Sequence, residues 1–318
     1  MKKIKSFNKV LNLWCVSKIT PALFLASIMS LPAQAEITCP FGYVLVPGNS
    51  ELGTVDFCVM KYEAKAHKDR NANALVDLDE IRTNGCDRSG SSCEGGSHNW
   101  GLADHKPVSV PQGIPWRKIS RDKAAHECQS LGEDYYLISN VEWQTVARNI
   151  ELVSENWSEN QVGKGCLNQG NVSVDSDCSY NGRGPEPGAR IAATHLLSNG
   201  ETISDFSGNV WEWVSDDNNQ KQGGNAYIAS QPSVKSKYGP SGNYSCNSQN
   251  RYCGLGYGYT DYSAGAVRRG GSWFNLDFAG VFAVGLDHVP SYSNHVVGFR
   301  CVFRPESHLA PLPADYTE

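Results

Sequence analysis

The sequence predicts an α+β domain with two main helices, short strands and long ordered loops, stapled by disulfides. Three observations lead to this class. Two segments carry helix caps, a few short segments alternate apolar and polar residues, and ten cysteines follow residue 35. Between these elements, Gly, Ser, Asn and Asp occur in scattered clusters with no regular repeat and no linker. We therefore expect helices and short strands to share one core.

Short strands are expected near both ends of the mature chain. Segments 41–48 (FGYVLVPG) and 56–64 (DFCVMKYEA) alternate and carry β-branched or aromatic residues, which is typical of strands. Strands are expected again around 265–273 and 297–304. The stretch between about residues 155 and 265, rich in Gly, Asn and Ser, is expected to be mostly loop.

Two helices are expected between these strands. The first, 120–132, begins at the cap residue Ser120 and ends at a glycine. The second, 139–153, begins with Ser139 and Glu142, which have the spacing of a capping box ahead of an apolar face.

Residues 1–35 have the pattern of a secretory signal peptide. Five lysines and no acidic residue precede the apolar run PALFLASIMSL, and AQA at 33–35 offers small residues before Glu36. The run is too short to span a bilayer, and no later segment is apolar enough to do so. A buried core helix is the alternative. We expect 36–318 to be exported as a single domain to the periplasm, the cell surface or the medium.

The net charge argues against nucleic acid as a partner. The chain has a formal charge of −5, and removal of the five signal lysines would change it to −10. An acidic surface repels phosphate backbones.

The cysteines of the mature chain predict disulfides. An even number in an exported chain is typical of a disulfide framework, and no C-x-x-C pair favours zinc or redox chemistry. Four pairs are close neighbours and two cysteines are far apart, but the sequence alone leaves the connectivity open. The pairs considered are Cys39 with Cys58, Cys86 with Cys93, Cys166 with Cys178, Cys246 with Cys253, and Cys128 with Cys301.

Seven short motifs stand in an order that resembles one known family, the sulfatase-modifying-factor family of the formylglycine-generating-enzyme type. Each motif alone is weak evidence for the family, and the seven in order are strong evidence. Together they cover roughly residues 40–305. They are KYEA at 61–64, PW and IS within 115–120, AAHECQSLG at 124–132, LISNVEWQTVAR at 137–148, SGNVWEW at 207–213, RRGGSW at 268–273 and GFRCV at 298–302.

The resemblance implies a variant of the C-type lectin fold, in which a disulfide ties the first helix to the last strand. Cys128 and Cys301 occupy those two places. The enzymes of this family bind copper through two cysteines, the first three residues after the GGS serine and the second five residues later. Here those positions hold Asn275 and Gly280, and no cysteine lies between residues 254 and 300. Because soft thiolates hold monovalent copper, we expect no copper and no enzymatic activity of this type.

The segment from Phe274 to Val297 predicts a diversified binding face. It lacks Lys, Gln, Glu, Met and Trp, the residues that codons ending in cytosine do not encode. The two flanking motifs, RRGGSW and GFRCV, form a frame around this segment. The frame and the composition of the segment together resemble the variable proteins of diversity-generating retroelements, in which a lectin-type fold carries a C-terminal variable region. The alternative is the chance composition of a glycine-rich β segment.

A fixed frame that carries aromatic and small polar side chains suits ligand binding. For Val281, Phe282, Ala283 and Val297 we favour core packing, and we expect the frame residues Gly270, Gly271, Trp273, Phe299 and Cys301 to be buried or fixed. The candidate ligand-binding residues are Phe274, Asn275, Leu276, Asp277, Phe278, Gly285, Leu286, Asp287, His288, Tyr292, Ser293, Asn294, His295 and Val296.

Calcium is the one cofactor that the sequence suggests, at two places. Segment 69–80 has the donor spacing of a calcium loop, although Ala74 replaces the usual glycine, and a plain acidic loop is the alternative. The family resemblance implies a second site around GNVWEW, where a tight turn is the alternative. The candidate ligands are Asp69, Asn71, Asn73, Leu75, Asp77 and Glu80 in the first site, and Asp205, Gly208, Val210 and Glu212 in the second.

These observations predict an exported, non-catalytic protein of the receptor or adhesin type. Its expected partner is a protein or glycan on another cell or a phage. The alternatives are a formylglycine-generating oxidoreductase, a small-molecule enzyme of the same fold without the cysteine pair, and a structural envelope protein.

Overall fold

A computed structural model describes residues 37–68, 105–172, 178, 194–221, 224–228, 232–244 and 253–305. The chain from Ala35 onward is one compact unit. The predicted signal peptide, the predicted calcium loop at 69–80, and Cys86, Cys93 and Cys246 lie outside the described residues.

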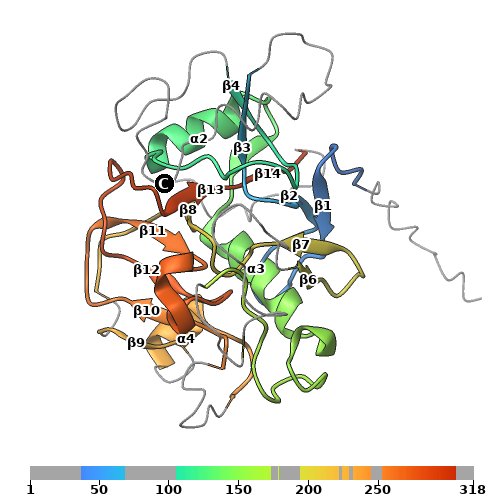
Figure 1. Ribbon diagram of the computed structural model, residues 1–318, viewed down its shortest axis with the longest axis vertical. Helices are drawn as coiled ribbons and strands as arrows, with labels where there is room; N and C mark the ends of the chain where they lie inside the picture. Colours follow the sequence, from blue (N-terminus) through green and yellow to red (C-terminus); the bar gives the residue numbers. More distant parts are fainter. Residues whose placement is uncertain are drawn as a thin grey trace, which may run out of the picture. The chain divides into compact units, whose positions relative to one another are not determined.

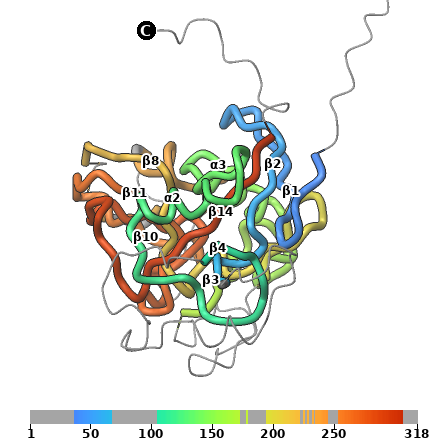
Figure 2. Tube along the Cα trace, turned by 90° about the horizontal axis from the view of Figure 1, so that it is seen from above, coloured from blue at the N-terminus to red at the C-terminus, as the bar shows by residue number. Residues whose placement is uncertain are grey.

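One sheet brings the two ends of the domain together. It is antiparallel and has the order β1 (Tyr43–Val46), β2 (Phe57–Met60), β14 (Cys301–Phe303), β5 (Tyr135–Leu137). Strand β14 thus lies between two strands that are distant from it in sequence, and Figure 2 shows β14 (red) near β2 (blue). Both N-terminal strands and the final strand were predicted.

The second sheet holds the candidate site and has six strands (Figure 1). Most described residues of the stretch 155–265 lie outside helices and strands, as expected, but this stretch also supplies the longest strand of the sheet. The first half of that strand, WEWV, is buried at every position, so it lacks the alternation that identifies a half-buried strand. The order is β13 (Val297–Phe299), β8 (Trp211–Asn218), β11 (Gly265–Arg269), β12 (Val284–Gly285), β10 (Tyr257–Tyr259) and β9 (Ala226–Tyr227).

Both predicted helices form where their caps place them. Helix α2 (Arg121–Gln129) begins after Ser120, whose side chain accepts the Lys123 N–H, and it ends a few residues before the predicted stop. Helix α3 (Asn140–Glu151) begins with the predicted capping box. The remaining elements are β3 (Lys65–Lys68), β4 (His105–Val108), β6 (Thr194–Leu196), β7 (Thr202–Ser204), α4 (Pro232–Tyr238) and the 3₁₀ turns η1 (Ser154–Asn156) and η2 (Trp273–Phe278).

The core is built around buried aromatic side chains. Trp143 of α3 stacks on Phe206 with ring centroids 3.8 Å apart, and its indole N–H donates to the Val281 carbonyl at 2.7 Å. Phe299 packs against Trp116 in a second cluster. The four residues predicted to be core within the variable segment, Val281, Phe282, Ala283 and Val297, are wholly buried.

Three disulfides have both partners among the described residues. They are Cys39–Cys58, Cys128–Cys301 and Cys166–Cys178, as predicted. Cys253 is also disulfide-bonded. Such a framework is typical of chains that fold in an oxidising compartment outside the cytosol. No helix among the described residues has the length and apolar character needed to cross a membrane.

Candidate functional site

The display segment, which we define as residues 274–296, begins in a capped 3₁₀ turn. The Asn275 side-chain oxygen accepts hydrogen bonds from the N–H and the hydroxyl of Ser272 at 3.0 and 2.7 Å. The Asn275 amide nitrogen donates to the Tyr259 hydroxyl at 3.2 Å. Asn275, predicted to contact ligand, therefore uses its hydrogen-bonding groups to hold the turn.

The tip of this turn presents apolar side chains to solvent. Phe274 is 72% exposed and Leu276 is 39% exposed, while Trp273, Asp277 and Phe278 are half-buried. Leu276 has φ +56° and ψ −136°, a conformation that non-glycine residues rarely adopt. Phe274 and Leu276, two of the candidate ligand-binding residues, are therefore accessible from solvent.

The middle of the display segment is core, which corrects two predictions. Leu286 is wholly buried in the main cluster, and its N–H donates to the Tyr259 carbonyl at 3.0 Å. Gly285 is buried in β12, between β10 and β11, where an added Cβ would approach Arg268 Nη2 to 3.1 Å. Both residues continue the apolar run that starts at Val281, so neither offers a ligand-binding side chain.

An ion-paired cluster follows the buried strand. Arg268 Nη2 lies 2.6 Å from one Asp287 oxygen, and His288 Nδ1 lies 3.1 Å from the other. The ring centroid of His288 is 3.6 Å from that of Tyr292. Burial alone would raise the pKa of Asp287, but the neighbouring His288 and the charge of Arg268 lower it to about 2. Asp287 is thus a fixed anion and not a group poised for proton transfer near neutral pH.

The last part of the display segment is half-buried. Ser293, Asn294, His295 and Val296 are each partly exposed. Burial lowers the pKa of His295, and the charges of Arg117 and Lys118 lower it further. The ring centroids of His295 and of Trp273, which directly precedes the segment, lie 6.4 Å apart, so the two ends of the display segment come together at this point.

The frame around the segment is largely buried, as predicted. Phe299 and Cys301 are wholly buried, and Gly270 and Gly271 adopt positive φ angles of 87° and 79° that favour glycine. Trp273 is only half-buried, but its backbone N–H donates to the Asn209 carbonyl at 2.8 Å, so its position is fixed, as predicted.

The second of the two copper-ligand positions has no room for a side chain. A Cβ added at Gly280 would lie 2.3 Å from the Leu255 carbonyl carbon and 2.4 Å from the Gly256 nitrogen. Both are backbone atoms, so the chain itself would have to move. With Asn275 capping the turn and Gly280 packed against backbone, the paired-thiolate arrangement does not fit this chain.

The second predicted calcium site lies in a tightly curled turn. Asp205 and Gly208 both have positive φ, and Glu212 is wholly buried with both oxygens bound by Arg300 at 2.6 Å. The buried Ser207 hydroxyl has no hydrogen-bond partner among the described residues. A carboxylate has about four lone-pair sites, so the Arg300 pair leaves acceptor capacity on Glu212. The described residues contain no group of three or more His, Cys, Asp or Glu arranged to hold a metal, so a cation here would need the backbone carbonyls of Gly208 and Val210.

Three residues that support the display segment were not singled out from the sequence. Tyr259 and Arg268 contact it directly, and Gln169 binds its backbone. The alternating GYGY sequence before Thr260 could have indicated the strand that carries Tyr259. Nothing local marks Gln169, because its partners lie more than a hundred residues away.

Comparison with known proteins gives one family. The model of the sulfatase-modifying factor enzyme 1-like domain matches residues 42–305, most of the chain. No curated protein sequence matches the chain. The family match agrees with the predicted α+β fold of the formylglycine-generating-enzyme type.

Solved structures with similar folds include proteins of several kinds. The Major Tropism Determinant P3c variant has 14% identity and a TM-score of 0.35, over 83% of this chain and 53% of that one. The chain therefore spans about half the length of that protein. CarF has 17% identity and a TM-score of 0.40, over 83% and 94% of the two chains. The Treponema denticola variable protein 1 has 14% identity and a TM-score of 0.33, over 84% and 100%. Scores of this size carry no inference about function.

Proposed function

Because this chain belongs to the sulfatase-modifying factor enzyme 1-like domain family, we propose that it uses the family scaffold for ligand binding and not for copper-dependent oxidation. The observation that supports this most is at the two copper-ligand positions. Asn275 caps a turn, and Gly280 is packed against the backbone of Leu255 and Gly256. Whether a protein of this fold binds a ligand or catalyses a reaction depends on the residues of its site and not on the fold.

The proposed ligand-binding face is the exposed part of the display segment. Phe274 and Leu276 supply apolar surface at one end, and Val289 is 50% exposed further along. Half-buried polar residues such as Asp277 and Asn294 supply hydrogen-bonding groups beside them. Aromatic anchors next to small polar groups are the composition that paratopes use. We propose a protein or glycan on a cell or phage surface as the partner, met by an exported protein.

We further propose that the display segment is diversified by a retroelement. Its composition fits codons ending in cytosine throughout residues 274–297. A template copy with adenine-directed differences and a reverse transcriptase gene near the coding sequence would support this, and their absence would remove it without affecting ligand binding.

Calcium remains a proposal at both predicted places. In the second site, Asp205 and Glu212 would supply charged oxygens, and Gly208 and Val210 would supply backbone carbonyls. Oxygen donors of this kind suit a hard cation, which would neutralise charge and hold the turn.

Binding is tested with fluorescently labelled full-length mature protein on a glycan array and on a panel of intact cells and phage particles. The display variant replaces Phe274, Leu276 and Val289 by serine. The matched control replaces Phe41, Leu152 and Val162, which are similarly exposed but lie elsewhere. We expect the display variant to lose the binding that the wild type shows, and the control to keep it. Equal binding by both variants would contradict the proposal, as would copper-dependent oxidation of a sulfatase cysteine peptide by the purified protein.

A further inference from the structure

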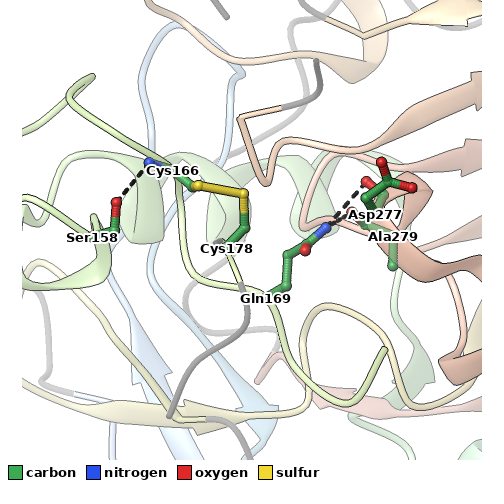
Figure 3. The surroundings of a disulfide bond; sticks show 6 residues. All are labelled: Ser158, Cys166, Gln169, Cys178, Asp277 and Ala279. Atoms are coloured by element: carbon green, nitrogen blue, oxygen red, sulfur yellow. Dashed lines mark hydrogen bonds between the residues drawn. A yellow bond between two sulfur atoms is a disulfide. The ribbon is translucent and has the colours of Figure 1, made fainter. Parts of the chain in front are cut away.

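A glutamine outside the display segment holds the backbone of that segment. Gln169 is wholly buried, and its side-chain amide donates to the carbonyls of Asp277 and Ala279 at 3.2 and 2.5 Å (Figure 3). Both acceptors are main-chain atoms. The contact therefore does not depend on which side chains the segment carries at these positions.

Gln169 is itself fixed by a disulfide loop. Its N–H donates to the Cys178 carbonyl at 2.6 Å, and Cys178 is bonded to Cys166 (Figure 3). The Cys166 N–H donates to the Ser158 hydroxyl at 2.9 Å, and the Leu167 N–H donates to the Cys253 carbonyl at 2.8 Å. The backbone around Gln169 is thus held on several sides before its side chain reaches the display segment.

Other anchors of the display segment are also main-chain contacts. The Lys118 N–H donates to the Asn294 carbonyl at 3.0 Å, and the Arg121 N–H donates to the Pro290 carbonyl at 3.1 Å. The Trp211 N–H donates to the Val296 carbonyl at 2.8 Å. These three contacts hold the end of the segment. At its start, Gln169 reaches the backbone with a side chain, so a point substitution can remove the contact.

We infer that Gln169 is a positioning residue, which fixes the backbone of residues 277–279 so that this part of the face keeps one geometry whatever its side chains are. The inference rests on the proposed ligand-binding function for its biological meaning. A buried carbonyl that loses its donor costs free energy, so the turn should open more often when the amide is absent. An exposed tip on a mobile backbone would also have to be ordered upon binding, which weakens affinity.

The test compares two wholly buried glutamines. Gln169→Met removes the two hydrogen bonds at similar side-chain volume. Gln144→Met is the matched control, because Gln144 is similarly buried and its amide binds the Gly239 carbonyl and the Arg269 guanidinium, neither of which belongs to the display segment. Hydrogen exchange of backbone amides is measured in the full mature protein, with the amides of Asn275, Ala279 and Gly280 as reporters.

We expect Gln169→Met to raise exchange at these three amides by about tenfold or more, with unchanged exchange in strands β1, β2 and β14. Gln144→Met should leave the three reporters unchanged. If Gln169→Met does not fold, Gln169→Asn, whose amide is one methylene too short to keep the same contacts, carries the same comparison. Unchanged reporters in the Gln169 variant, or equal changes in both variants, would overturn the inference.

A second arm separates backbone positioning from side-chain packing. Gln169→Met is combined with Phe274→Ser and Leu276→Ser, and the exchange increase should persist because the lost contacts were to carbonyls. Disappearance of the increase would overturn the inference. Exchange requires no ligand, so failure to find any binding partner would count against the proposed function and leave this result standing. Where the cell and phage panel yields a bound particle, Gln169→Met should weaken its binding by about tenfold, and Gln144→Met should not.

Discussion

Arg300 and Glu212 form a wholly buried ion pair in which guanidinium Nε and Nη2 each lie 2.6 Å from a different carboxylate oxygen. The pair joins the GFRCV motif to the GNVWEW motif. The Arg300 guanidinium also donates to the Met60 carbonyl at 3.1 Å and the Ser204 carbonyl at 3.2 Å. Arg300 lies between β13 and β14, so this one side chain links the two large sheets to the β6–β7 hairpin.

Removing one partner of this pair should damage the fold. Arg300→Met leaves the buried Glu212 carboxyl without its cationic partner, which costs about 3–5 kcal/mol of unfolding free energy. Urea denaturation of the purified protein measures it. Lys221→Met is the control, because Lys221 Nζ lies 3.8 Å from a carboxylate oxygen of Asp261 and both side chains are exposed. Exposed ion pairs of this kind contribute about 0–1 kcal/mol to stability. Similar losses in both variants would contradict the prediction.

The display segment should tolerate change only where it is exposed. Leu286→Ala truncates a wholly buried side chain and should cost about 2–5 kcal/mol. Phe274→Ala truncates a side chain that is 72% exposed and should change stability by about 0.5 kcal/mol or less. Thermal unfolding of the two variants distinguishes them. A destabilised Phe274 variant would show that the tip is part of the core.

Asp287 should make stability depend on pH in the acid range. Its folded pKa, about 2, is below the ordinary value of 3.8. A lowered pKa contributes stability that is present above the ordinary value and is lost as pH falls through about 2. Asp287→Asn should therefore cost at most about 2 kcal/mol at pH 7, because water screens the exposed quarter of the side chain.

Denaturation across pH checks this prediction. The difference in unfolding free energy between wild type and the Asp287 variant should be constant from pH 7 to about pH 4 and should shrink below it. Asp261→Asn, in an exposed pair, should show almost no difference. If the difference in unfolding free energy between wild type and Asp287→Asn is still undiminished at about pH 2, packing and not charge explains the lower stability of the variant.

Restoring the cysteine pair should not restore copper binding. Gly280→Cys forces a Cβ to within 2.3 Å of the Leu255 backbone and should cost at least about 1–3 kcal/mol. The double variant with Asn275→Cys also loses the cap on Ser272. Competition with a copper(I) chelator and thermal unfolding together test this. Tight stoichiometric copper in a stable double variant would refute it.

Calcium should stabilise the folded protein if the proposed sites bind it. A ligand that binds only the folded state adds about 2.7 kcal/mol when present at about 100 times its Kd. The melting temperature should therefore rise with calcium and fall with EDTA. Asp205→Ala should remove the part of the shift that comes from the second site. Overlapping melting curves in calcium and in EDTA would argue against both sites.

The sequence by itself determined the local features. The capping box of Ser139 and Glu142 lies within one helical turn, so its consequences need no distant partner. The family resemblance, which rests on the order of the motifs, correctly implied the Cys128–Cys301 disulfide. The apolar run from Val281 to Ala283 was correctly predicted to belong to the core. The missing cysteine pair could also be read directly, because it concerns which residues are present and not where they lie.

Only the tertiary structure decided which display residues face outward and what holds them. Leu286 is core because β12 lies between β10 and β11, and Asp287 is fixed by Arg268 on a neighbouring strand. Gln169 reaches Ala279 across 110 positions of sequence. Each of these contacts depends on strand order and register over long separations, whereas periodicity and caps report only on neighbours within a few residues.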